Sequence, residues 1–177
     1  MKNSTATTHY DRKTIALHWA SAAIVLLLWI AGEFLDLVPR GTPRVTVRSL
    51  HISLGLLLGF VLVYRIWWRS HGGVRFTEDA GARYTQAART GHRVLYAVMA
   101  LMVLTGIALV WIRGDNLFNL VTVAAFDPSN KELRHNAREV HSWIANTLLA
   151  AAVLHGAMAA WHHMVLKDGI LRRMLPQ

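Results

Sequence analysis

Residues 138–163 read REVHSWIANTLLAAAVLHGAMAAWHH. The stretch is long and apolar enough to cross a lipid bilayer, yet it contains histidines. His141 and His155 are 14 residues apart, so in a helix they lie on nearly the same face, ~21 Å apart along the axis, with one near each membrane surface. An ionisable side chain inside a membrane span is by default a candidate functional residue. Either histidine alone is equally explained as a hydrogen-bonded packing residue.

The composition indicates a membrane protein. The chain has 177 residues, of which 54% are hydrophobic, and it carries 19 Lys and Arg against 10 Asp and Glu. Its mean hydropathy is +0.31. Basic charge can also mean nucleic-acid binding, but here the charges fall between long apolar runs instead of forming a soluble basic face. We therefore expect a chain surrounded by lipid, with no nucleic-acid partner.

The chain contains no cysteine. This excludes disulfides, iron–sulfur clusters, thiolate metal sites and covalently attached c-type haem. Any haem would have to be held by histidine or methionine. The polar N-terminus does not have the pattern of a cleavable signal peptide, so the first apolar run is expected to stay as a membrane anchor.

Four stretches reach the ~20 residues needed to span a bilayer: residues 14–34, 49–68, 90–112 and 141–166. An even number of spans returns both termini to one side of the membrane. The two terminal segments and the second connection hold 12 Lys and Arg, and the other two connections hold 7, so the positive-inside rule places both termini in the cytoplasm. The sequence predicts an all-α, integral membrane four-helix bundle formed by a single domain, residues 1–177.

The fourth helix is expected to begin outside the membrane. An Asp-Pro pair at residue 127 marks a turn, and the residues from Ser129 to Glu132 have the form of a capping box. This pattern predicts a helix start near Asn130, so that the helix protrudes before it enters the membrane near His141.

The histidines match in depth across three helices. His18 in the first span and His155 in the fourth lie near the cytoplasmic surface, whereas His51 in the second span and His141 in the fourth lie near the periplasmic one. Neutral imidazole is a common axial ligand of haem iron. Two pairs at two depths predict two non-covalent haem b groups, each held by two histidines. His92, at the start of the third span, is a competing ligand near the cytoplasmic surface.

Arginines at the ends of the second span are candidate partners for haem propionates. Arg65 and Arg69 lie at its cytoplasmic end and Arg48 at its periplasmic start, and guanidinium groups bind carboxylates in a bidentate manner. Snorkelling and topology explain these arginines equally well. Gly55, one turn from His51, leaves room for a flat, bulky group against the helix, or for ordinary close helix packing.

Short motifs in all four spans are shared with a known family. They are Leu17-His18-Trp19, His51-x-x-x-Gly55 with Arg65, Gly91-His92, Thr105-Gly106, His141, and His155 with His162-His163. With these motifs the chain resembles, over nearly its whole length, the bacterial cytochrome b561 family of small di-haem membrane cytochromes, and looks closest to its superoxide oxidase branch.

The resemblance implies a four-helix bundle in the bacterial inner membrane that holds two haems b, with His18, His51, His141 and His155 as ligands. The branch implies electron transfer from superoxide at the periplasmic face to ubiquinone in the membrane. The same fold serves as the cytochrome b subunit of hydrogenases and dehydrogenases, so it does not fix the electron donor.

The outer loops carry a group of basic residues that could focus the superoxide anion toward the outer haem. Six acidic residues share that side, so any positive field must be local. The basic residues are Arg40, Arg44, Arg48, Arg113, Lys131, Arg134 and Arg138.

At the cytoplasmic surface, His162 lies two turns beyond His155 on the same face, and Lys167 lies just past it. Both are candidates for binding and protonating a quinone, although snorkelling explains Lys167 equally well. Three function classes follow. The first is superoxide:ubiquinone oxidoreductase, the second is a cytochrome b subunit between a partner dehydrogenase or hydrogenase and the quinone pool, and the third is a non-redox metal or ion transporter, which would be colourless.

Overall fold

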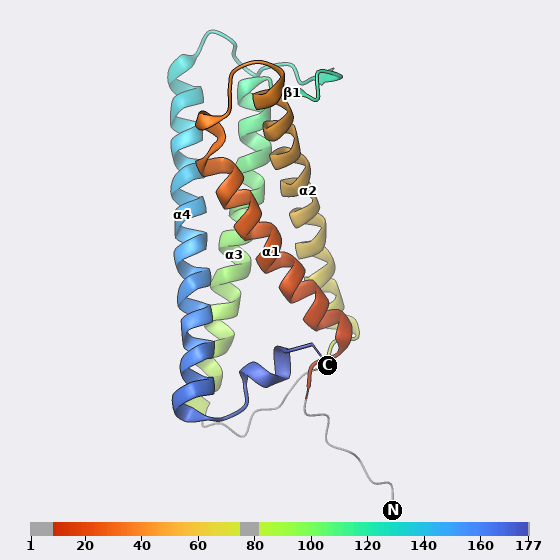
Figure 1. Cartoon of the computed structure of the whole chain (residues 1–177), viewed down its shortest axis with the longest axis vertical. Coiled ribbons are helices and arrows are strands. Elements are labelled where there is room, and N and C mark those ends of the chain that lie inside the picture. Colours follow the sequence, from red (N-terminus) through yellow and green to blue (C-terminus); the bar gives the residue numbers. More distant parts are fainter. Residues whose placement is uncertain (1–8, 75–81, 177) are drawn as a thin grey trace, which may run out of the picture.

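Four long helices form an elongated bundle (Figure 1). The computed structural model describes residues 9–74 and 82–176. The helices are α1 Arg12–Glu33, α2 Thr42–His71, α3 Ala82–Arg113 and α4 Lys131–Trp161. Within the described ranges, these four contain the stretches that are long and apolar enough to cross a membrane. The predicted all-α membrane bundle is therefore confirmed. Residues 1–8 and 75–81, which carry part of the predicted inward charge, lie outside the described ranges.

Neighbouring helices in the chain run in opposite directions (Figure 1). The first and last described residues lie at the same end of the bundle, which we call the inner end, and the opposite end is the outer end. α1 and α3 run from the inner to the outer end, and α2 and α4 return.

Apolar side chains cover the outside of the bundle as well as its core. The interior cluster is small and consists of Leu58, Leu62, Met99 and Leu148. Phe60, in the middle of α2, is 74% exposed. A soluble protein rarely exposes apolar surface of this kind. In a bilayer, lipid solvates such a surface, and each helix satisfies its own backbone hydrogen bonds.

α2 is longer than the predicted span. It begins at Thr42 instead of near Ser49, with Pro43 in its first turn. Proline is tolerated there because the first amides of a helix have no partner within the helix. The outer loop after α1 is correspondingly shorter than predicted.

α4 starts where the sequence predicts, but the predicted capping box does not form. Asn130 is the capping residue, and its side-chain oxygen accepts a hydrogen bond from the amide of Leu133 at 2.8 Å. The Ser129 hydroxyl instead donates to Asp127 at 2.6 Å. Either serine or asparagine can cap a helix, so the sequence alone did not decide between neighbouring positions.

A short hairpin follows α3 at the outer end (Figure 1). Its strands, β1 Asn116–Leu117 and β2 Val121–Thr122, pair antiparallel. Phe118 and Asn119 form the turn with positive φ angles of 53° and 59°, a conformation rare for a bulky residue. The amide of Phe118 donates to the hydroxyl of the buried Ser49 at 2.8 Å. This bond ties the α3–α4 connection to α2.

The C-terminal segment closes the inner end of the bundle. After α4 the chain continues through a π-helical turn, η2 His162–Leu166, and a short 3-10 helix, η3 Leu171–Met174. The amide of Tyr10 donates to the Arg173 carbonyl at 3.1 Å, and Trp19 Nε1 donates to the Met174 carbonyl at 2.8 Å. The last described residues are therefore attached to α1.

Asp11 holds the inner ends of α1 and α2 together. Its carboxylate caps α1 by accepting from the amide and hydroxyl of Thr14 at 2.9 and 2.7 Å, and it accepts from Trp68 Nε1 at 3.0 Å and from the Val74 amide at 3.2 Å. Burial acts to raise the pKa of Asp11, but these hydrogen bonds outweigh it and lower that pKa from 3.8 to about 2. Because the folded-state pKa is the lower one, this stabilisation is complete above about pH 4 and is lost as the pH falls toward about 2.

We expect Asp11→Ala to lower the free energy of unfolding by roughly 1–2 kcal/mol, the usual cost of a lost helix cap. The variant should also lose less further stability than the parent when the pH is lowered from about 4. Thermal unfolding in detergent, followed by circular dichroism at pH 7 and pH 3, measures both effects. Asp11→Asn keeps one acceptor for the cap and should be less affected. An unchanged melting temperature of Asp11→Ala at pH 7 would contradict this role.

Candidate functional site

The structure brings the four predicted histidines together as two pairs. The ring centres of His18 and His155 are 6.2 Å apart at the inner end, with the ring planes inclined by 58°. Those of His51 and His141 are 6.4 Å apart at the outer end, inclined by 67°. Each pair joins α4 to a helix from the first half of the chain, and the pairs lie at the two depths that the helical spacing predicts.

The separation within each pair fits two imidazoles that share one metal ion. A metal–imidazole nitrogen bond is ~2 Å long, which places the centres of two rings on opposite sides of a metal about 6 Å apart. Space for a flat group is also present on the helices. A Cβ atom added at Gly55 or at Gly156 would meet no heavy atom within 4 Å. The residues present therefore fit the group that the sequence predicts.

The outer pair is packed against glycines of neighbouring helices. A Cβ atom at Gly32 of α1 would lie 3.4 Å from Cε1 of His51, and one at Gly106 of α3 would lie 3.2 Å from Cε1 of His141. The Thr105 hydroxyl lies 3.2 Å from Nδ1 of His141. Nδ1 of His51 is buried, and it has no partner in hydrogen-bonding geometry among the described residues.

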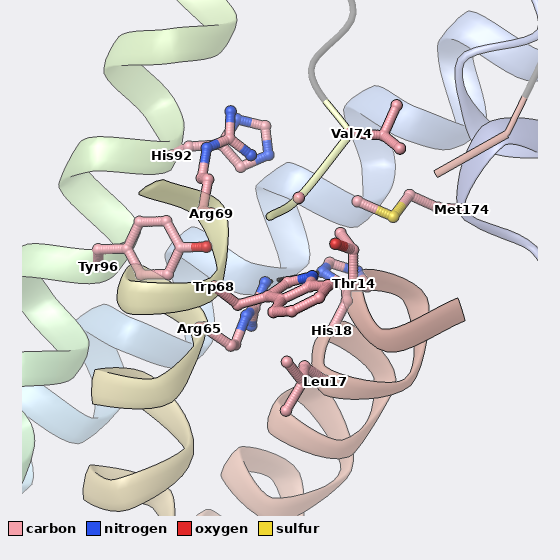
Figure 2. Close-up of a pocket in the computed structure, with 11 residues that line it drawn as sticks. Thr14, Leu17, His18, Arg65, Trp68, Arg69, Val74, His92, Tyr96 and Met174 are labelled. Atoms are coloured by element: carbon pink, nitrogen blue, oxygen red, sulfur yellow. Dashed lines mark hydrogen bonds between the residues drawn. The ribbon is translucent and has the colours of Figure 1, made fainter. Parts of the chain in front are cut away.

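His18 of the inner pair lines a cavity at the inner end (Figure 2). His18 comes from α1, Arg65 and Arg69 come from α2, and His92 and Tyr96 come from α3. Nη2 of Arg65 lies 3.4 Å from Nδ1 of His18, and its guanidinium carbon lies 5.4 Å from the centre of the Tyr96 ring. Both arginines predicted at this end of α2 thus line the cavity beside His18.

His92 also lies beside His155, but in a different geometry. Their ring centres are 5.2 Å apart and the rings meet edge to face, at 74°. This separation is shorter than the ~6 Å that a shared metal requires. Nδ1 of His92 lies 2.8 Å from the Ala88 carbonyl, one turn earlier in α3. The geometry favours His18 over His92 as the partner of His155.

A second, basic pocket opens at the outer end. Its one lining carboxylate is Asp115, which lies 3.5 Å from Arg48 and 3.4 Å from Arg113. Burial raises the pKa of Asp115, and the two arginines oppose this shift. The pocket is lined by Arg48, Arg113, Gly114, Asp115, Asn116, Arg134, His135 and Arg138.

Two of the predicted outer arginines have structural partners away from this pocket. Arg44 donates to the carbonyls of Asp36 and Val38, at 2.6–2.9 Å, and so holds the turn between α1 and α2. Arg138 bonds to the carboxylate of Asp36, and this bond lowers the pKa of Asp36. Arg44 therefore belongs to the fold of the loop, whereas Arg138 both lines the pocket and braces the loop.

His162 and Lys167, the predicted quinone residues, have different surroundings. Nδ1 of His162 donates to the carboxylate of Asp168 at 2.5 Å. Burial acts to raise the pKa of Asp168, but this hydrogen bond and a second one from the Ile170 amide lower it. Lys167 is exposed and adopts a left-handed conformation, with φ of 51°, where η2 ends. Within residues 9–74 and 82–176, no contact links Lys167 to a site.

Three residues in these environments were not predicted from the sequence: Thr105, Asp115 and Asp168. Thr105-Gly106 is one of the motifs that carry the family resemblance, but the sequence assigned it no role, although it contacts His141. Asp115 lies in the connection after α3, which carries another acidic residue, and Asp168 is the one acidic residue of the C-terminal segment. Their distinguishing feature is contact with residues far along the chain or across a turn, which spacing does not reveal.

Comparisons with known proteins agree with this architecture. Residues 9–177 match the sequence profile described as prokaryotic cytochrome b561. The chain is 26% identical over 171 residues to a probable superoxide oxidase of Yersinia pestis, with 95% of this chain and 96% of that protein covered. It is 31% identical over 175 residues to cytochrome b561 homolog 2 of Escherichia coli, with 94% and 90% covered. The chain therefore belongs to the prokaryotic cytochrome b561 family of multi-pass membrane proteins, which bind haem b and transfer electrons.

Proposed function

We propose that the protein is a di-haem cytochrome b that transfers electrons from superoxide at the outer face to ubiquinone near the inner end. The observation that carries the proposal is the pairing of His18 with His155 and of His51 with His141, each at a separation that fits a shared iron. Haem b, when bound there, supplies one-electron carriers at two depths of the membrane.

Arg65 is placed to bind a propionate of an inner haem once His18 has adopted the tautomer that ligates iron. An arginine is only a donor, so the 3.4 Å contact requires Nδ1 of His18 to accept and leaves the ring proton on Nε2. Ligation through Nε2 needs the opposite tautomer, in which Arg65 has no acceptor on His18. Its guanidinium is then available to a haem propionate. Arg69 lines the same cavity, and Arg48 occupies the corresponding position in the outer pocket.

The outer pocket suits a small anion. Four arginines line it against one carboxylate, so its local charge stays positive although the outer side as a whole is nearly neutral. Such a concave, charged surface concentrates an anionic substrate. Loss of one electron from superoxide requires no nucleophile and no general base. A relative that is named a probable superoxide oxidase, and that matches almost the whole chain, supports this choice of substrate.

The inner end suits protonation of a quinone. Reduction of one quinone to a quinol consumes two electrons and two protons, so two superoxide anions are oxidised to oxygen for each quinol formed. Asp168 holds the proton of His162 on Nδ1, which fixes the orientation of the ring. Imidazole can pass on protons near neutral pH. Lys167, which is exposed beside this pair, is the second candidate quinone residue.

We place the inner end in the cytoplasm of a bacterium, with the protein as a single domain in the inner membrane. The 12 Lys and Arg of the inner segments, against 7 in the outer ones, support this orientation. Protons for the quinol would then come from the cytoplasm.

The proposal predicts that the purified chain alone reduces ubiquinone when superoxide is supplied. His162→Ala should keep both haems and their fast reduction by superoxide, but lower the rate of quinol formation by roughly the 10²-fold typical of a lost proton donor. Asp168→Asn should show a smaller defect of the same kind. Stopped-flow absorbance measures haem reduction, and quinol absorbance measures the second step.

His71→Ala is the matched control, because His71 is an exposed histidine at the inner end of α2 that bonds to Ser70 and Trp67. This variant should form quinol at the parent rate. Quinol formation by His162→Ala at the parent rate would remove His162 from the mechanism. Absence of quinol formation by the parent chain would overturn the proposed function itself.

A further inference from the structure

The Thr105-Gly106 motif of α3 lies directly against His141. The Thr105 hydroxyl oxygen is 3.2 Å from Nδ1 of His141. A Cβ atom at position 106 would approach Cε1 of the same ring to 3.2 Å, closer than most side chains allow. One residue therefore makes a polar contact with the imidazole, and the next provides the space in which the ring lies.

The hydrogen-bond pattern around Thr105 favours the imidazole as the donor in this contact. A hydroxyl group has one hydrogen and two acceptor lone pairs. The Thr105 hydroxyl donates its hydrogen to backbone carbonyls of its own helix, Leu101 at 2.9 Å and Met102 at 3.1 Å. It can then only accept from the imidazole, so Nδ1 of His141 carries the ring proton. Nε2 is left with its lone pair, as ligation of iron requires.

The surroundings of two other histidines differ from this. Among the described residues, Nδ1 of His51 is buried without a partner in hydrogen-bonding geometry. Nδ1 of His18 faces the cationic Arg65. An acceptor at Nδ1–H makes an imidazole a stronger electron donor to a metal, whereas a nearby positive charge disfavours the more positive, oxidised metal. Positive charge is present at both pairs, since Arg113 acts on His141 as Arg65 does on His18. The acceptor at Nδ1 of His141 is therefore the feature that acts to lower the potential at the outer pair.

We propose that Thr105 is a positioning residue that fixes the tautomer of His141 and thereby lowers the reduction potential of the outer haem below that of the inner one. Gly106 contributes the space for the imidazole in this orientation. The inference rests on the proposed function, because it concerns a haem held by His51 and His141. The difference in potential sets the direction of electron transfer. A haem of lower potential at the outer site gives its electron to the inner haem, which is the direction from superoxide to quinone.

The test uses Thr105→Val, which keeps the shape of threonine but has no hydroxyl group, and Thr105→Ser, which keeps the hydroxyl group. Potentiometric titration of the purified chain, followed at the haem absorbance bands, gives the two potentials. In Thr105→Val we expect the outer-haem potential to rise while the inner one stays unchanged, so that the gap between them narrows. Thr105→Ser should titrate like the parent. His51→Ala, which leaves one haem, identifies the wave that belongs to the outer site.

The other possible results of this experiment either support or overturn the proposal. Loss of the outer haem in Thr105→Val with its retention in Thr105→Ser supports the proposal, because ligation then depends on the hydroxyl. Equal potentials in the parent and both variants overturn it, and so does loss of the outer haem in both, which indicates packing alone. A parent chain with no outer haem contradicts the proposed function instead, and haem extraction from the parent distinguishes that case before any titration.

Discussion

Replacing His155 with alanine is expected to remove the same haem that is lost on replacing His18, and so to halve the haem content of the chain. The reason is the inner pair: the two rings lie 6.2 Å apart, and loss of either one leaves a haem with a single axial histidine. His51→Ala and His141→Ala should each remove the other haem, because their rings form the outer pair. Reduced-minus-oxidised spectra with a haem count per chain measure the loss.

The controls for this experiment are the parent chain and His92→Ala. Acid–acetone should extract all haem from the parent, since the chain has no cysteine for covalent attachment. His92→Ala should retain both haems, because His92 stands too close to His155 for a shared metal. The pairing is wrong if His18→Ala and His51→Ala change the same spectral component. If His92→Ala, and not His18→Ala, abolishes the inner haem, then α3 holds the ligand.

The second large effect is expected in the reaction with superoxide. If the arginines of the outer pocket attract the anion, its second-order rate with the oxidised protein should fall roughly tenfold between low and moderate salt, because the Debye length shrinks from ~30 Å at 0.01 M to ~10 Å at 0.1 M. Arg134→Gln and Arg138→Gln should slow the reaction at low salt and flatten its salt dependence. Pulse radiolysis or stopped flow with a superoxide stock measures the rate.

Arg40→Gln is the matched control. Arg40 is an exposed arginine of the outer loop that does not line the pocket, so its loss removes the same charge from the same side. Its variant should react nearly as fast as the parent. Arg44 is less suitable, since it braces the loop through Asp36 and Val38. A rate that is indifferent to salt and to Arg134, in a chain with both haems, would favour a cytochrome subunit whose donor is a partner dehydrogenase.

The arrangement of the histidines could be predicted from the sequence because two strong constraints act together. Membrane spans must be helical, and a helix converts the spacing of His141 and His155 into a depth and a face. The structure adds the distances within the pairs, and these separate His18 from His92 as the partner of His155. Spacing alone places both at the same depth.

Polar contacts between distant segments could not be predicted in this way. Asp115 meets Arg48 across 67 residues of chain, and Thr105 meets His141 across 36. Neither contact leaves a periodic signal, because each depends on how the helices pack and how the outer connection folds. The same holds for Arg44. The sequence alone suggests an arginine available to an outer anion, but in the structure its guanidinium donates to the Val38 carbonyl of the neighbouring loop.

α4 supplies one histidine to each pair, and this has a consequence for the biogenesis of the protein. Chains are made from the N-terminus, so His18 and His51 enter the bilayer well before His141 and His155. Neither pair is complete until the fourth helix has been inserted, and the attachment of Arg173 to Tyr10 comes last of all. If the two pairs hold haem as proposed, a nascent chain arrested before α4 lacks one of the two axial histidines at each depth.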